Sequence, residues 1–197
     1  MTPRAAFATA ALAALAAALG GCAGTGPGAQ PALERLVESP GDGAARLELL
    51  GDRVVVAAVP VGEGLLPPAA RTAIEAIAPG GAVTFAGFES GPRGSGWRVE
   101  KRYAESAQSR SALVTPEGAV LERWHTVPVR DVPTDALRAV ADLGATVDEA
   151  RIVSGPVREE RWTFLVRDRL QRRRIVDVSL RGELLAQRRR LDATVDV

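Results

Sequence analysis

The stretch LPPAARTAIEAIAPG (66–80) decides the fold we expect, because a second stretch, VPTDALRAVADLG (132–144), repeats its pattern. In the first stretch Ala70, Ile74 and Ile77 have the i, i+4, i+7 spacing that puts apolar side chains on one face of a helix. Both stretches begin with proline near the first turn and end at glycine, which can adopt the left-handed C-cap conformation. The sequence therefore predicts the same amphipathic helix twice.

The similarity continues downstream of each helix. Two candidate strands and a tight hairpin follow, at 82–90, 97–103 and 110–124 in the first copy and at 147–155, 162–168 and 174–188 in the second. Trp97 and Trp162 open equivalent strands, and Gly118 and Gly182 occupy equivalent turns, where glycine can take positive φ. This pattern indicates a unit of one helix and about four strands with a period of about 65 residues.

The strand WRVEKRY (97–103) alternates Trp97, Val99 and Lys101 with charged residues, which predicts one packed face and one face in water. We expect Trp97 and Trp162 to pack beneath the helix of their own unit, and the two units to form lobes side by side. Gly51-Asp52 predicts a hairpin within 44–61, which we expect at the edge of the first sheet.

The N-terminus has the pattern of a processed leader. Arg4 precedes an apolar run of about 15 residues, which is shorter than the run of about 20 that spans a bilayer. The tetrapeptide Leu19-Gly20-Gly21-Cys22 then resembles the lipobox of bacterial lipoproteins, which implies a diacylglycerol on the thiol of Cys22 and cleavage before it. An ordinary secretory leader and an uncleaved anchor are the alternatives.

The remainder of the chain is long enough for one medium or two small domains. The whole sequence has 25 Lys and Arg against 24 Asp and Glu, and Arg4 lies in the leader, so the mature chain is close to neutral and nucleic acid is not an expected partner. Cys22 is the only cysteine, which excludes an intramolecular disulfide. We predict a signal peptide (1–21), the lipidated Cys and a flexible tether (22–43), a hairpin with the first unit (44–131), and the second unit (132–197). Within the tether span, 31–39 is either a short helix or a frayed leader.

The repeated residues resemble PepSY-like domains, through the helix start LP..AR.AI, the tryptophan-led strand and the hairpin ALVTPEGAVLE (112–122). The resemblance covers about residues 63–192, and the second copy departs from it with Arg181 where an acidic turn residue is usual. It implies an α+β fold of two repeated helix-plus-antiparallel-sheet units without catalytic residues. The tandem arrangement also resembles secreted β-lactamase-inhibitor proteins, in which a concave sheet grips an enzyme.

The sequence contains little that indicates catalysis. His125 is the only histidine, whereas Ser-His-Asp hydrolases and most zinc sites place histidine against specific partners. The glycine-rich stretch 87–97 lies between two strands and is predicted as a hairpin, because a phosphate-binding loop needs a following helix. We therefore expect no enzyme, no cofactor and no metal site.

Two features point to binding. Arginines concentrate in 158–190, and those we expect to converge are Arg172, Arg173, Arg174, Arg188, Arg189 and Arg190. Guanidinium groups bind carboxylates and phosphates bidentately, although a solvated sheet face is the simpler interpretation of such a run. Trp124 lies outside the tryptophan repeat and is our candidate for an exposed binding tryptophan.

These observations predict a membrane-anchored lipoprotein of the cell envelope, facing the periplasm from the outer membrane if the host is Gram-negative. We expect a non-catalytic binding or inhibitory module for an envelope protein. The alternative is a structural or assembly lipoprotein that uses an arginine-rich face to bind anionic lipid or peptidoglycan. The sequence does not indicate an oligomeric state.

Overall fold

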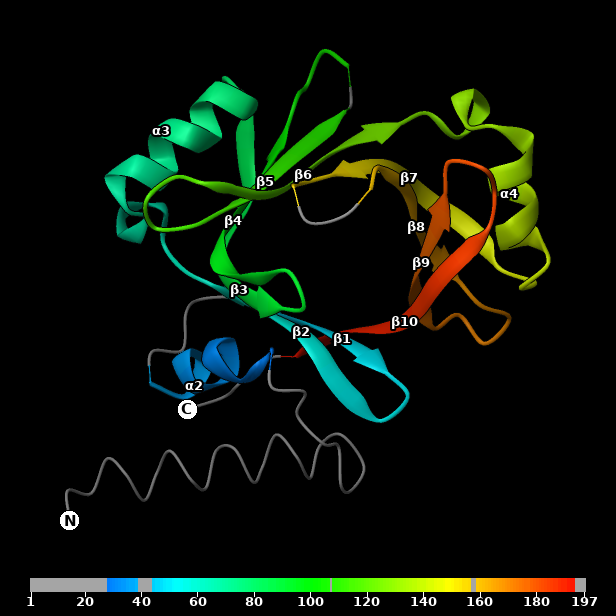
Figure 1. The fold of residues 1–197 in the computed structure, drawn as a ribbon, viewed down its shortest axis with the longest axis horizontal. Helices are drawn as coiled ribbons and strands as arrows, with labels where there is room; N and C mark the ends of the chain where they lie inside the picture. Colours follow the sequence, from blue (N-terminus) through cyan, green and yellow to red (C-terminus); the bar gives the residue numbers. More distant parts are fainter. Residues whose placement is uncertain (1–27, 39–43, 107, 157–158, 194–197) are drawn as a thin grey trace.

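The computed structural model describes residues 28–38, 44–106, 108–156 and 159–193. In these residues ten antiparallel strands close into one barrel, in the order β1-β10-β9-β8-β7-β6-β5-β4-β3-β2 (Figure 1). The strands are β1 (Ala45–Leu50), β2 (Arg53–Pro60), β3 (Ala82–Gly91), β4 (Gly94–Arg102), β5 (Ser109–Val114), β6 (Val120–Val127), β7 (Thr146–Ser154), β8 (Arg161–Arg167), β9 (Arg173–Ser179) and β10 (Leu184–Ala193).

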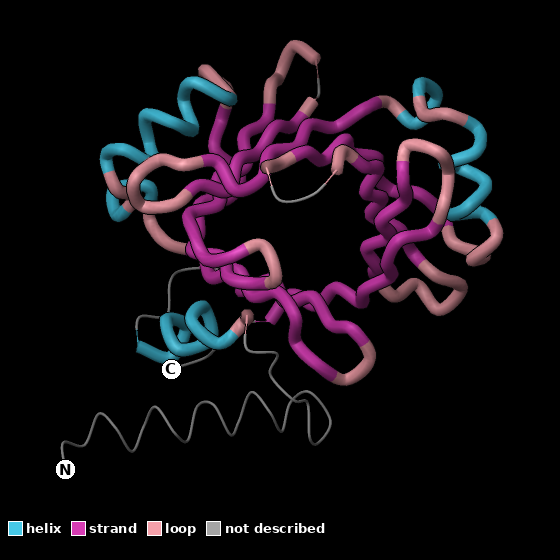
Figure 2. Tube along the Cα trace, in the orientation of Figure 1, coloured by secondary structure: helices cyan, strands magenta, loops and turns pink. Residues whose placement is uncertain are grey.

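Helices lie outside the ring of strands, as Figure 2 shows. They are α2 (Gln30–Glu38), α3 (Pro68–Ile77) and α4 (Thr134–Ala141), with short 3₁₀ helices η1 (Glu63–Leu65) and η2 (Val129–Asp131). Helices α3 and α4 fall within the two stretches predicted to be helical, which confirms that prediction. The segment 31–39 is for the most part the helix α2, which packs on β2 and β3.

The fold class predicted from the sequence is wrong. The structure is mostly β, and the strands form one closed barrel instead of two repeated helix-plus-sheet units. Strands β6 and β7 pair from Arg123 with Ser154 to Val127 with Ala150, so the two halves share one sheet and are not separate lobes. Pairing satisfies strand edges that would otherwise expose unpaired N–H and C=O groups.

The β1–β2 hairpin closes the barrel. The prediction of a turn at Gly51-Asp52 is confirmed, since Gly51 has φ 64° and β1 pairs with β2 on either side of it. The predicted position at a sheet edge is wrong, because β1 also pairs with β10 and β2 with β3. The hairpin thus bridges the two edges that the other strands leave open.

Apolar side chains pack between the barrel wall and the helices. Trp97 lies in a buried cluster with α3, and Trp162 in a buried cluster with α4, which confirms the packing expected for both. A further cluster forms beneath α2, where Ser90 of β3 accepts a hydrogen bond from the Ala32 amide and donates one to the Ala29 carbonyl, both 3.0 Å long. The apolar face of the sheet therefore points outward, beneath the helices.

The charged face of the strands consequently points into the barrel. Arg98, predicted to face water, is 3% exposed and lies inside. The prediction that β4 has a packed face and a charged face is confirmed. The prediction that the charged face lies in water is wrong. The interior is accordingly the place to look for a functional site.

Candidate functional site: the charged barrel interior

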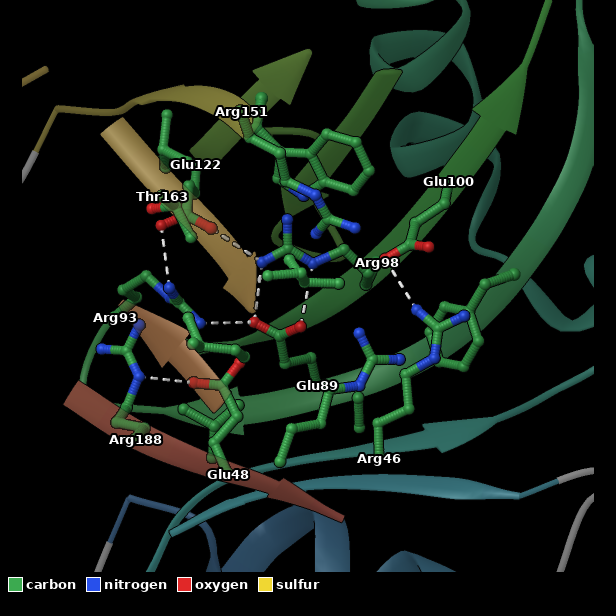
Figure 3. Close-up of a pocket in the computed structure, with 18 of the residues that line it drawn as sticks. Arg46, Glu48, Glu89, Arg93, Arg98, Glu100, Glu122, Arg151, Thr163 and Arg188 are labelled. Carbon is green, nitrogen blue, oxygen red and sulfur yellow. Dashed lines mark hydrogen bonds and ion pairs between the residues drawn. The ribbon is translucent and has the colours of Figure 1, made fainter. Parts of the chain in front are cut away.

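Charged side chains from eight strands and one turn meet inside the barrel (Figure 3). They come from alternate positions of the strands, whose intervening residues pack outward against the helices. The interior set comprises Arg46, Glu48, Glu89, Arg93, Arg98, Glu100, Glu122, Arg151, Arg161, Asp177, Arg188 and Arg190. They surround a cavity of about 60 Å³.

Glu122 of β6 is the centre of the densest group of ion pairs. Its carboxylate lies 2.9 Å from a guanidinium nitrogen of each of Arg93, Arg98 and Arg161. Arg98 also donates two hydrogen bonds of 2.8 Å to Glu89, and Arg93 lies 3.1 Å from the same carboxylate. Burial by itself would raise the pKa of Glu122, but the three arginines lower it to about 2.

Asp177 of β9 is a second centre. It accepts a hydrogen bond of 2.7 Å from the Thr163 hydroxyl and lies 2.8 Å from Nη2 of Arg188. Arg188 also contacts Glu48 of β1 at 2.9 Å, and Arg161 joins this centre to the first through a 3.6 Å approach to Asp177. The two centres therefore form one continuous network across the barrel.

We call this network the paired cluster. Its members are Glu48, Glu89, Arg93, Arg98, Glu122, Arg161, Asp177 and Arg188. It contains four guanidinium groups and four carboxylates, so its charges balance. Buried ions cost several kcal/mol each unless they are paired, and this cluster supplies that pairing internally.

Helix α3 connects β2 to β3 and helix α4 connects β6 to β7, both at the same end of the barrel. Three further arginines, Arg46, Arg151 and Arg190, lie nearer this end, and we call them the arginine triad. Arg46 of β1 stacks over the ring of Phe85 with its Cζ 3.8 Å from the ring centroid. Arg151 of β7 stacks in the same way over Trp124, also at 3.8 Å, and Arg190 of β10 completes the triad. Stacking on an aromatic face holds a guanidinium group in place while leaving its edge free to donate hydrogen bonds.

The triad is less well neutralised than the paired cluster. Nη1 of Arg46 lies 2.7 Å from Glu100, and Arg151 contacts Glu149, its neighbour two residues earlier on the same strand. Among the described residues, the carboxylate that Arg190 contacts is Asp192, with both Nε and Nη2 3.5 Å away.

Asp192 cannot neutralise Arg190 fully, because its other oxygen lies 2.8 Å from Arg173. Burial, together with the like charge of Arg46 and then of Arg151, lowers the pKa of Arg190, and Asp192 offsets this only in part.

The arrangement favours binding over proton transfer. A general acid or base is most effective when its pKa lies near the working pH. The pKa of Glu122 is about 2, and that of Glu89 is also lowered by Arg98 and Arg93, against the effect of its burial. Both carboxylates therefore stay ionised near neutral pH and serve as fixed counter-ions. Within the described ranges, no group of three His, Cys, Asp or Glu residues has a geometry that could hold a metal ion.

Trp124, the candidate for an exposed binding tryptophan, is 6% exposed and lies beneath Arg151. Its place is thus in the barrel wall, where it supports one member of the triad. His125, the next residue on β6, is exposed on the outside of the barrel.

The arginines expected to converge are distributed over four environments. Arg188 and Arg190 point into the barrel, whereas Arg189 between them is exposed on the outside. Arg172 and Arg174 share the carboxylate of Asp168, at 2.8 and 2.9 Å.

Arg173 of β9 pairs with Asp192 of β10. The six therefore do not form one surface, and two of them belong to the interior site.

Cys22 and the leader lie outside the described residues. Among the helices that the structure describes, none is long and apolar enough to cross a membrane.

Sequence reasoning missed most of the interior residues, including Arg46, Glu122 and Arg151. A usable signal exists, because several strands carry charged residues of both signs on the face opposite their apolar residues. That signal becomes specific only when the faces are known to point toward one another.

No protein-family model matches the chain, and no curated protein matches its sequence. Solved structures from Bacteroides species are similar to it. A protein from Bacteroides eggerthii has 14% identity and a TM-score of 0.49, with 64% of this chain and 90% of that chain covered. A DUF2874 family protein from Bacteroides uniformis has 13% identity and a TM-score of 0.47, covering 62% and 88%.

A BLIP-like protein from Bacteroides fragilis has 17% identity and a TM-score of 0.43, covering 68% and 92% of the two chains. Likenesses of this extent carry no argument about what the present chain binds.

Proposed function

We propose that this chain is a lipid-anchored binding protein of the cell envelope, which holds a partner without transforming it. The observation that carries the proposal is the paired cluster, in which arginines keep Glu89 and Glu122 ionised and paired. Glu89 and Glu122 therefore act as counter-ions to the arginines, since a general acid or base works best with a pKa near the working pH. The leader and the lipobox at Cys22 support the envelope location.

The barrel constrains how a partner can approach. The concave face of the sheet, which a β-lactamase-inhibitor-like mode of binding would use, is closed over by β1 and β2 and filled by the paired cluster. A partner protein therefore meets either the outer wall or an end of the barrel, and we consider the end at which the arginine triad lies. At that end an open pocket of about 640 Å³ is lined by Arg46, Thr84, Phe85, Arg190 and Asp192. We assign partner binding to this end.

Photo-crosslinking in the native envelope tests the assignment. A photoreactive amino acid replaces either Thr84, which is exposed in the open pocket, or Thr72, which is exposed on α3. We expect a crosslinked partner from position 84 that is absent from position 72, because the two sites differ in location but match in residue type and exposure. Identical products at both positions, or none at position 84, would contradict the assignment.

The lipid anchor is tested separately by Cys22→Ser. The variant should lose its acyl chains and leave the membrane fraction, since two or three acyl chains are needed for stable anchoring. Mass spectrometry of the N-terminus and membrane fractionation measure the two effects. An unmodified Cys22 in the native host would remove the anchor from the proposal.

The alternative of an arginine-rich face on anionic lipid or peptidoglycan has less support. The arginines that would form it point in different directions, and Arg172, Arg173 and Arg174 already have carboxylate partners.

A further inference from the structure

Positive charge inside the barrel is unevenly distributed. The paired cluster balances four guanidinium groups with four carboxylates, whereas in the arginine triad Arg46 pairs with Glu100 inside the barrel and Arg151 with the partly exposed Glu149. The carboxylate nearest to Arg190 is Asp192 at the rim, which it shares with Arg173. A further carboxylate, the exposed Glu63, lines the open pocket. What sets the triad apart is therefore the weak pairing of Arg190.

The Nε atom of Arg190 is buried and has no hydrogen-bond partner among the described residues, as is also true of Nε in three arginines of the paired cluster, Arg93, Arg161 and Arg188. Those three each place another guanidinium nitrogen 2.8–2.9 Å from a carboxylate, whereas the contacts of Arg190 with Asp192 are 3.5 Å long. A buried, unpaired charged donor is costly, and a bound anion would supply the missing acceptor.

Two connected spaces lead to these arginines. The central cavity of about 60 Å³ and the open pocket of about 640 Å³ are both lined by Arg46, Phe85 and Arg190, so these residues lie where the two spaces meet. The inner space is about a tenth of the volume of the open pocket, so it suits a compact head group. The open pocket has apolar walls at Val61 and Val83, with Glu63 also in its lining, and can hold a larger and less polar portion of a ligand.

We propose that the arginine triad binds the carboxylate or phosphate group of a small amphiphilic anion, whose apolar portion lies in the open pocket between η1 and β3. This inference deepens the proposed function, on which it rests, by naming the ligand class of the partner-binding end of the barrel.

Geometry supports an anionic head group in particular. Guanidinium edges from β1, β7 and β10 line one cavity, and such forks match the oxygen geometry of carboxylates and phosphates. Phe85 and Trp124 hold two of the guanidinium planes in place before a ligand arrives, which reduces the entropy lost on binding. A cationic head group would be repelled by the three guanidinium groups that line the inner cavity.

Calorimetric titration of the purified full-length chain tests the proposal with four probes: hexanoate, hexyl phosphate, inorganic phosphate and hexylamine. We expect hexanoate and hexyl phosphate to bind, with affinity that falls as salt is added. Inorganic phosphate should bind more weakly than hexyl phosphate because it has no apolar portion, and hexylamine should not bind. Equal binding of the two phosphates would overturn the role of the open pocket, and binding of hexylamine would overturn the anion site.

Arg190→Gln is the decisive variant, and Arg189→Gln is its matched control. The two arginines are neighbours on β10, but Arg189 is exposed on the outer face of the barrel. We expect R190Q to weaken hexanoate binding by about tenfold or more, the loss of one charge-assisted contact, and R189Q to leave it within about twofold. Arg190→Lys should retain part of the affinity because it keeps the charge.

R190Q should still fold, because the loss of the 3.5 Å contact with Asp192 is offset by relief of the repulsion with Arg46 and Arg151, and circular dichroism checks this. Arg46→Gln is a second variant, with the same expected loss of binding. Equal weakening by R189Q and R190Q, or no binding of either amphiphile at concentrations up to about 10 mM, would overturn the anion site. Crosslinking through position 84 separates a failure of the anion site from a failure of the proposed function. If the anion site fails but wild type and R190Q still capture the same envelope partner, the proposed function stands. If neither protein captures a partner, the proposed function fails as well.

Discussion

Glu122→Gln is the sharpest test of the idea that the paired cluster holds the barrel together. The substitution keeps the size and shape of the side chain but removes the charge that three guanidinium groups share at 2.9 Å. The new amide N–H₂ group also faces other donors, with which it cannot hydrogen-bond. Glu122 is 3% exposed, so water cannot replace the lost interaction.

The loss of folding free energy in E122Q can be worked out in two ways. Removing one partner of a buried ion pair costs about 3–5 kcal/mol, because the other charge remains buried. Independently, the fall in the pKa of Glu122 from 4.5 to about 2 corresponds to about 3 kcal/mol of stabilisation of the ionised form. For a domain of this size, a loss of this order lowers Tm by about 10 °C.

The same carboxylate predicts a pH dependence. Because the pKa of Glu122 is lower in the folded protein, the unfolded chain binds the proton first as pH falls. The stabilisation is therefore complete above about pH 4.5 and is lost progressively as the pH falls to about 2. The lowered pKa of Glu89 acts in the same direction.

Urea denaturation followed by circular dichroism, at about pH 7 and about pH 3, measures both effects. Asp148→Asn is the control, because Asp148 pairs with Arg167 at 2.8 Å on the surface, where such pairs contribute about 0–1 kcal/mol. We expect E122Q to lose several times more stability than D148N at the higher pH, and to lose less than the wild type on acidification. Equal costs for the two variants, or an acid response in E122Q as steep as in the wild type, would refute the reasoning.

Two further substitutions test how the helices attach to the barrel wall. Phe164→Ala should destabilise the protein by about 3–5 kcal/mol in urea denaturation, because Phe164 is fully buried beside Trp162 in the cluster beneath α4. A cost below about 1 kcal/mol would show that α4 contributes little to the fold. Ser90→Ala should cost about 0.5–2 kcal/mol, since Ser90 anchors the first turn of α2 through the Ala32 amide and the Ala29 carbonyl. Hydrogen exchange should then rise in α2 first, and a uniform rise across the barrel would contradict the local role.

Much of the local structure was predictable because its signals are local. The apolar spacing of 66–80 marks α3, and the φ of 88° at both Gly118 and Gly182 is the conformation expected of glycine in these turns. The alternation of β4 correctly separated Trp97 from Arg98. Helix periodicity, strand alternation and turn chemistry each depend on residues close together in the chain.

The candidate site was largely unpredictable for the converse reason. Arg93 comes from the β3–β4 turn, Arg98 from β4, Arg161 from β8, and Glu122, which joins them, from β6. Of the arginines named from the sequence, Arg188 and Arg190 do belong to the interior, but Arg189 between them does not, because successive side chains of a strand point to opposite faces.

The sequence by itself determined the helices, most of the strands, their turns and the division of each strand into an apolar and a charged face. Only the tertiary structure decided that the apolar face would be covered by helices on the outside and the charged face enclosed within. The physical reason is that closure depends on the pairing of β6 with β7 and of β1 with β10, between residues distant in the chain. A charged strand face has the same sequence pattern in water and inside a barrel, and the opposite charges that make enclosure possible come from strands that meet only once the barrel has closed.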